Sequence, residues 1–209
     1  MRIPLRIQET VAALLVVGLM TFSASNVNGQ ESTTRGFNLG GHIQAGSLAL
    51  EGGEGDNGGG LGIRVGYGIN RIITLYFEAD GFAVDSENSE LFQGDWSLGQ
   101  GDLGARFHFA NALRSWVPYL DVAVGGRTVT VKNTRASDQD EGTVKFNGGA
   151  VSFGGGLGVY LKENLALDVG LKASFGTFNE IEIGAWSGQV LDIEATSTRF
   201  KVGIVWWKQ

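Results

Sequence analysis

The sequence contains no cysteine, only two prolines and only two histidines among its 209 residues. Without cysteine the fold holds no disulfide, so hydrogen bonds and packing alone must stabilise it. Charged residues are also scarce, at 18% of the chain, and acidic residues outnumber basic ones by 22 to 16. Because nucleic-acid binding needs a basic surface, this balance excludes a nucleic-acid partner.

Glycine is abundant, with 34 residues, and hydrophobic residues make up 43% of the chain. Collagen would need a strict three-residue glycine period, and a disordered chain would hold far fewer apolar residues. Glycine within strands instead indicates close backbone approach or a crowded interior.

The N-terminal segment has the pattern of an export signal. Arg2 and Arg6 precede an apolar run at residues 11–20, and the small residues Ser23 and Ser25 offer a cleavage site. The run is shorter than the roughly 20 residues that a transmembrane helix needs. We therefore expect a signal peptide at 1–25, a short segment at 26–35 and one barrel domain at 36–209. A cut after Gly29 and an uncleaved anchor helix are the alternatives.

Residues 165–175 alternate in polarity at every position. Leu165, Leu167, Val169 and Leu171 share one face of a strand, and Asp168 and Lys172 lie on the opposite face with small residues between them. Such a strand fits a closed sheet with one apolar face and one polar face.

The same alternation predicts eight strands. They are expected at 37–49, 61–69, 72–83, 96–109, 116–131, 148–161, 165–175 and from about 196 to the C-terminal tryptophans. The connections alternate between long and short, with long loops at 51–59, 85–95, 132–146 and 177–195. An up-and-down sheet places all four long loops at one end and the three short turns at the other.

The charged residues of these strands all fall on the face opposite the apolar one. This face carries six basic and five acidic residues, which we expect to form a lumen charge network: Arg64, Glu78, Asp80, Asp102, Arg106, Asp121, Arg127, Asp168, Lys172, Arg199 and Lys201. The four long loops hold three basic and fourteen acidic residues, so the net negative charge gathers at one end.

A soluble barrel would turn its apolar face inward, whereas a membrane barrel would turn it toward lipid. Glycines crowd the polar face, which suits a narrow interior filled with long side chains. Aromatic residues gather at the short-turn end, where we expect a periplasmic girdle of Tyr67, Phe107, Phe109, Trp116, Trp206 and Trp207, with Tyr119 and Tyr160 nearby. The sequence therefore predicts an all-β, eight-stranded, up-and-down antiparallel transmembrane β-barrel.

Strands such as Leu-Gly-Ile-Arg-Val-Gly-Tyr-Gly-Ile at 61–69 and Leu-Gly-Val-Tyr-Leu at 157–161 resemble those of the small outer-membrane barrels of Gram-negative bacteria, the class that includes OmpX and the OmpA transmembrane domain. The resemblance implies a bacterial outer-membrane location, with both termini and the short turns in the periplasm. It also implies membrane lipid and the barrel-assembly machinery as partners of a monomeric barrel. In one departure, Lys208 and Gln209 follow the terminal aromatic pair, whereas such barrels usually end on an aromatic residue.

An eight-stranded barrel is just wide enough to be filled by side chains, so we expect the lumen charges to pair and plug it. A narrow aqueous pore is the alternative. Enzymatic modification of lipid is a second one, but only His42 and His108 are available, with Asp85-Ser86 as the nearest nucleophile candidate. We expect no enzyme activity and no cofactor.

The loops are the expected interaction sites. Glu51, Glu54 and Asp56 lack the spacing of a calcium loop, so no dedicated metal site is predicted, although divalent cations are expected to bridge acidic loops to lipopolysaccharide phosphates. Alternation in the apolar last loop indicates a hairpin that extends two strands, through Ile181, Ile183, Trp186, Val190, Leu191 and Ile193. Its edge is either open to a partner strand or packed on its neighbours.

Overall fold

The computed structural model describes residues 34–50, 55–84, 95–109, 115–135, 141–183 and 186–208. The expected signal peptide, most of the segment that follows it, Glu51, Glu54 and the Asp85-Ser86 pair lie outside these residues.

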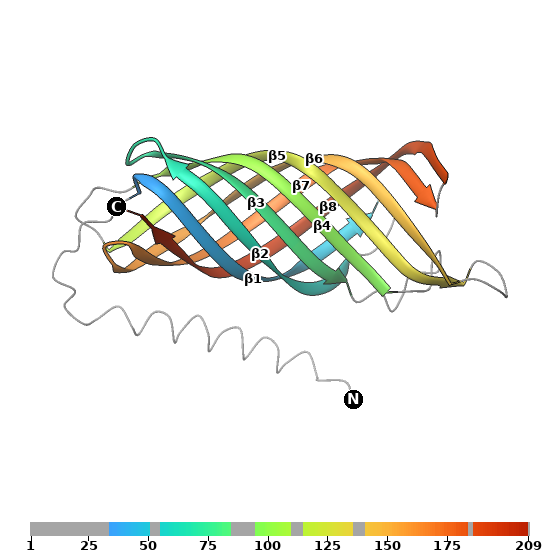
Figure 1. Cartoon of the computed structure of the whole chain (residues 1–209), viewed down its shortest axis with the longest axis horizontal. Helices are drawn as coiled ribbons and strands as arrows, with labels where there is room; N and C mark the ends of the chain where they lie inside the picture. The colour runs from blue at the N-terminus through green and yellow to red at the C-terminus, as the bar shows by residue number, and fades with distance from the viewer. Residues whose placement is uncertain are drawn as a thin grey trace, which may run out of the picture.

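The described residues form a closed barrel of eight antiparallel strands in sequence order (Figure 1). The barrel closes where β1 pairs with β8, with Leu39 opposite Trp206. The strands are β1 Gly36–Leu50, β2 Asp56–Gly68, β3 Ile73–Val84, β4 Asp95–His108, β5 Trp116–Arg135, β6 Glu141–Lys162, β7 Leu165–Ile183 and β8 Trp186–Trp207. The predicted fold class is therefore confirmed. Among the described residues no helix is long and apolar enough to cross a membrane.

We name the two ends of the barrel by their connections. The turn end carries the β2–β3, β4–β5 and β6–β7 connections together with the start of β1 and the end of β8. The loop end carries the other four connections. Strand order in the closed sheet confirms this alternation of the connections between the two ends.

Two predicted loops are wrong, because most of their residues are in strands. β5 continues to Arg135 and β6 begins at Glu141, so the segment 132–146 is largely a paired hairpin. In the segment 177–195, Ile183 pairs with Trp186, which confirms the hairpin that its alternation indicated. Polar composition concealed the strands within 132–146, since strand pairing beyond the barrel wall does not need an apolar face.

The apolar face of the sheet points outward. Ile43, Leu61 and Leu103 have exposed fractions of 69%, 68% and 65%, and large apolar side chains are exposed on all eight strands. The charged side chains of the same strands are mostly buried inside the barrel. This arrangement agrees with the transmembrane prediction and not with a soluble barrel, because exposed apolar surface of this extent needs a lipid environment.

Glycine on the inner face makes room for large side chains. A Cβ atom added at Gly104 would lie 2.6 Å from Cζ of Tyr76 and 2.7 Å from Cβ of Ala123. At Gly156 it would lie 2.5 Å from the hydroxyl of Tyr119. The interior thus holds two tyrosines because the facing strands carry glycine there.

Candidate functional site

The interior of the barrel holds a continuous set of ion pairs, and its turn-end part is centred on Arg106. The Arg106 guanidinium donates to Asp121 through two bonds, Nε to Oδ1 at 2.8 Å and Nη2 to Oδ2 at 3.0 Å. It also donates to Asp168, which accepts a further bond from the Tyr119 hydroxyl. The guanidinium carbon lies 3.4 Å from the centroid of the Tyr119 ring. Arg106 is therefore held by two carboxylates and one aromatic face at once.

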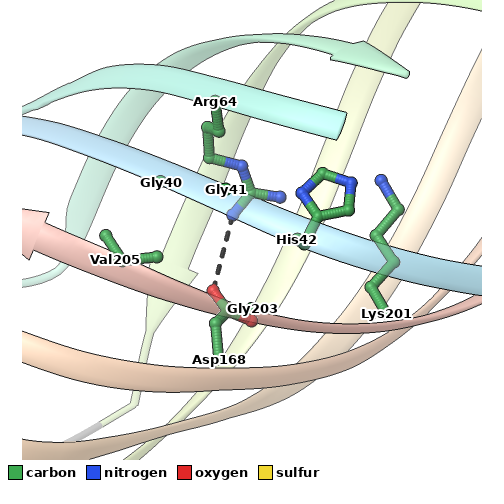
Figure 2. Close-up of a pocket in the computed structure, with 8 residues that line it drawn as sticks. All are labelled: Gly40, Gly41, His42, Arg64, Asp168, Lys201, Gly203 and Val205. Atoms are coloured by element: carbon green, nitrogen blue, oxygen red, sulfur yellow. Dashed lines mark ion pairs between the residues drawn. The ribbon is translucent and has the colours of Figure 1, made fainter. Parts of the chain in front are cut away.

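Arg64 connects this part to the middle of the barrel. Its Nη2 lies 2.5 Å from Oε2 of Glu78 and 3.6 Å from Oδ2 of Asp121. Its Nη1 lies 3.6 Å from Oδ2 of Asp168, the ion pair drawn in Figure 2. One guanidinium thus bridges three carboxylates that come from three different strands.

The middle of the barrel is organised around Glu78, which is fully buried. Oε1 of Glu78 accepts from Lys172 at 2.8 Å and from Lys201 at 2.5 Å. Lys172 also binds Asp102 at 2.6 Å, and Lys201 also binds Asp80 at 2.9 Å. Each lysine therefore joins two carboxylates, so the loss of one lysine would leave two buried acids with fewer partners.

Asp80 and Asp102 connect the predicted Arg199 and several polar side chains to this set. Asp80 also accepts from Arg199 at 2.7 Å and contacts Nε2 of His42 at 2.7 Å. Asp102 accepts from the Gln100 amide at 2.9 Å. Further participants are polar residues that share the inner face with the charges, namely Tyr119, Gln100, Ser152 and Ser174. Strand parity alone could have identified them.

Ten of the eleven residues expected in the lumen network take part in these ion pairs: Arg64, Glu78, Asp80, Asp102, Arg106, Asp121, Asp168, Lys172, Arg199 and Lys201. Arg127 is different. It is buried, but its Nη2 donates to the backbone oxygen of Ala195 at 2.9 Å, and its guanidinium faces the ring of Phe178.

Two apolar clusters lie inside the barrel, one on each side of the charges. The loop-end cluster consists of Leu48, Phe82, Val84, Trp96, Leu98, Val129, Val131, Phe178 and Ala195. The turn-end cluster consists of Val117, Tyr160, Ala166, Val205 and Trp207. Packed apolar side chains thus separate the charged middle of the barrel from both aqueous sides. The sequence analysis did not predict these two clusters.

A small cavity remains beside the ion pairs (Figure 2). Its volume is about 20 Å³, and it is lined by Gly40, Gly41, His42, Arg64, Asp168, Lys201, Gly203 and Val205. This volume accommodates roughly one or two water molecules. It is far below the several hundred Å³ of a typical small-molecule site.

His42, Glu78 and Asp80 bring three potential metal ligands within 4.8 Å of one another. Lys172, Lys201 and Arg199 already occupy these carboxylates, so a metal ion would have to displace ammonium or guanidinium groups. The geometry therefore favours ion pairing over a metal centre at this position.

The two histidines do not form a nucleophilic site with the described residues. His42 contacts Asp80, but no hydroxyl group of the described residues hydrogen bonds to it. His108 contacts the Thr74 hydroxyl at 3.0 Å, both residues are buried at the turn end, and the His108 ring lies beside Trp207. The Thr74 hydroxyl, which contacts the imidazole of His108, is therefore enclosed within the barrel.

The residues expected in the aromatic girdle divide between the two faces of the sheet. Tyr67, Phe109, Trp116 and Trp206 are exposed on the outside at the turn end, and Phe107 is partly exposed. Trp207 does not fit the girdle, because it is only 4% exposed and packs in the turn-end cluster. Tyr119 and Tyr160 are also buried inside. Position along the strand suggested a girdle for these three residues, but strand parity turns them inward.

A model of the outer membrane protein beta-barrel domain matches residues 11–204. The chain is similar in fold to Neisserial surface protein A, with 13% identity, a TM-score of 0.62 and coverage of 82% of this chain and 97% of that chain. A comparison with curated protein sequences finds no match.

Two further solved structures share the fold. The attachment invasion locus protein Ail of Yersinia pestis has 14% identity, a TM-score of 0.52 and coverage of 83% and 100% of the two chains. A major outer membrane protein from Thermus thermophilus has 10% identity, a TM-score of 0.55 and coverage of 80% and 98%.

Proposed function

This chain belongs to the outer-membrane β-barrel domain family and lies in the bacterial outer membrane, and from that premise we propose that it is a closed, non-enzymatic barrel that presents a protruding sheet for surface contacts. Residues 1–25 serve as its export signal, 26–35 as a short N-terminal segment and 36–209 as the barrel domain. The unequal length of the strands at the loop end is the observation that carries this function.

The closed lumen is supported by what fills it. Ten charged side chains pair across the middle of the barrel, and apolar clusters fill both ends. An ion crossing the barrel would have to displace packed apolar side chains and then break buried ion pairs, each of which costs several kcal/mol. The runner-up function, a narrow pore, would need these groups to separate.

Recording from planar lipid bilayers tests the closed lumen. The purified protein is expected to give no steady conductance, since side chains fill the interior. A variant with Phe82→Ala and Leu98→Ala thins the loop-end cluster, and the exposed Phe77→Ala serves as its control on the outer face. Steady ohmic conductance of the unmodified protein would reject the closed lumen in favour of the pore.

The protruding sheet is supported by the strand register at the loop end. The pairing of β8 with β1 stops at Leu50 and Ala195, but β8 starts nine residues earlier, at Trp186. Among the described residues, none of 186–194 pairs with β1, whereas 186–189, 193 and 194 pair with β7. Figure 1 shows the β7–β8 hairpin, in orange and red, extending past the end of β1. Within the described part of the chain, backbone groups on its outer edge have no partner strand and could pair with an additional strand.

The acidic charge of the β7–β8 hairpin indicates which class of partner strand it can bind. Glu180, Glu182, Asp192 and Glu194 lie on this hairpin, and Lys145 on the adjacent β6 lies 3.9 Å from Glu182. An extended segment rich in basic residues complements this acidic edge. The name of the similar Ail protein, attachment invasion locus protein, also favours attachment as the property to measure.

Shortening the hairpin in register tests this function. Removal of residues 181–188 and an Asn-Gly turn between Glu180 and Gln189, which are opposite each other, keep the rest of the ladder intact. The matched control joins Thr134 to Gly142, which are also opposite each other, and so shortens the β5–β6 hairpin. We expect cell adhesion to fall with the first deletion and to persist with the second. Equal adhesion of both deletion variants and the unmodified protein would reject the protruding edge as the contact site.

The absence of enzyme activity is part of the same proposal. It is supported by the enclosed histidines, since acyl or lipid transfer needs a nucleophile and base that face the substrate. Mass spectrometry of lipid A from cells with and without the protein checks it, and an altered acyl pattern in cells that contain the protein would show an enzyme.

A further inference from the structure

Arg127 is the one member of the lumen network that no described carboxylate pairs with. Its side chain is almost completely buried, with 2% of the residue exposed, directly below the loop-end cluster that contains Val129. Nη2 donates to the Ala195 oxygen at 2.9 Å, and the Phe178 ring centroid lies 4.7 Å from the guanidinium carbon. Nε and Nη1 have no partner among the described residues.

The lumen network contains six basic side chains but only five acidic ones. Each of the five carboxylates of the network is already paired with one or more of the other five basic side chains. A guanidinium stays protonated under all ordinary conditions, so Arg127 adds to a lipid-surrounded interior one positive charge that no described carboxylate compensates. A buried charge without a partner is strongly unfavourable, so a counter-charge is required.

Two other side chains with a polar atom that has no described partner lie on β8, the strand that Arg127 contacts. Ser197 and Arg199 follow Ala195 on the inner face of β8, and Ala195 is the residue whose oxygen binds Arg127. Ser197 Oγ and Arg199 Nε have no described partner. Arg199 Nη2 donates to Ser174, which is opposite Ser197 in the register, so these groups lie at one level of the barrel. Two guanidiniums and a hydroxyl at this level of the barrel thus carry N–H and O–H groups without a described partner.

We propose that Arg127, Ser197 and Arg199 bind a small monovalent inorganic anion of the chloride class inside the barrel. One such anion balances the single excess charge, whereas sulfate or phosphate would overcompensate it. The loop-end cluster encloses the site, which favours a compact anion that has lost most of its water. The Gln100 carbonyl oxygen, also without a described partner and opposite Arg127 in the register, accepts from a water that accompanies the anion.

Equilibrium unfolding in urea tests the site without assuming an activity. The purified protein, inserted into phosphatidylcholine vesicles, is compared in sodium chloride and in sodium gluconate at equal ionic strength. Chloride at ten times its dissociation constant is expected to raise the folded-to-unfolded ratio about tenfold. Arg127→Met removes the charge and is expected to abolish this chloride effect. In gluconate it is also expected to be more stable than the unmodified protein.

Lys162→Met is the matched control, because Lys162 is an exposed lysine at the turn end, and it should keep the full chloride response. A second measurement needs no variant. Crystals of the unmodified protein soaked in sodium bromide should show an anomalous peak within hydrogen-bond distance of the Arg127 guanidinium. Stability that is the same in chloride and gluconate overturns the proposal, and so does a bromide-soaked crystal without that peak. A loop carboxylate found at the guanidinium would likewise replace the anion as its counter-charge.

Discussion

Lys172 and Glu78 are joined by an ion pair of 2.8 Å although 94 positions separate them in the chain. Lys172 lies on β7 and Glu78 on β3, which do not pair in the sheet, so the contact crosses the interior of the barrel. The same ammonium group binds Asp102 of β4 at 2.6 Å. This one lysine therefore connects opposite walls of the closed sheet.

Lys172→Met is expected to lower the free energy of unfolding by about 3–5 kcal/mol, because it leaves Glu78 and Asp102 buried with fewer partners. Urea unfolding of the protein in vesicles measures the effect. The matched control is Lys145→Met, since the Lys145–Glu182 pair is exposed and its atoms lie 3.9 Å apart. Its effect should stay within about 0.5 kcal/mol. Equal effects of the two variants would contradict a role for Lys172 in holding the barrel together.

The sequence predicts the faces of the barrel well and the contacts across its interior poorly. Strand parity places Asp168 and Lys172 on the inner face, and both lie there. Parity does not say which charges meet across the lumen, because that depends on how far each strand is displaced around the closed sheet. The pairs of Lys172 with Glu78 and of Arg106 with Asp168 follow from that displacement.

Strand parity also predicts the inward direction of the loop-end cluster and of Trp207, which the sequence analysis did not derive. Phe82 continues the inner face of Asp80, and Leu98 continues that of Gln100 and Asp102, so the loop-end cluster follows from the same period. Trp207 shares the face of Lys201 and therefore points inward, although its position near the end of a strand suggests a girdle. For Trp207, the position along the strand predicts a place in the girdle, whereas strand parity predicts an inward side chain. The pleat of the strand sets the direction of the side chain, so Trp207 points inward.

Gly104→Ala tests whether the crowded interior requires glycine. The added Cβ would lie 2.6 Å from Cζ of Tyr76, so we expect a loss of about 1–3 kcal/mol in the free energy of unfolding. Gly101 of the same strand is the matched control, because its added Cβ would lie 3.8 Å from the Phe77 ring in ordinary contact. Gly101→Ala should be neutral or slightly stabilising. Similar losses for the two variants, measured by urea unfolding, would show that strand propensity and not interior space sets the requirement.

Chelation tests whether divalent cations join the acidic loop end to lipopolysaccharide phosphates. We expect EDTA to reduce the amount of lipopolysaccharide that copurifies with the protein, because carboxylate and phosphate oxygens are the ligands that Ca²⁺ and Mg²⁺ prefer. Replacement of Glu180, Glu182, Asp192 and Glu194 by glutamine should have the same effect. Glu163→Gln, an exposed acid at the turn end, is the control that should leave the amount unchanged. If EDTA leaves the amount of copurified lipopolysaccharide unchanged, the predicted cation bridge is wrong.

Trp206 and Trp207 are adjacent in β8, and they are expected to respond in opposite ways to substitution and to lipid. Trp206 is 40% exposed on the outer face, whereas Trp207 packs with Val117, Tyr160 and Val205 and has its ring centroid 6.2 Å from that of His108. Trp207→Ala should therefore lower the free energy of unfolding by about 3–5 kcal/mol. In vesicles of brominated lipid, Trp206→Phe should remove part of the quenchable fluorescence, because bromine atoms reach only outward-facing indoles. Trp207→Phe, which keeps an aromatic ring in the cluster, should remove unquenched fluorescence. Loss of quenchable emission with Trp207→Phe would place that indole in the lipid and contradict its packing inside the barrel.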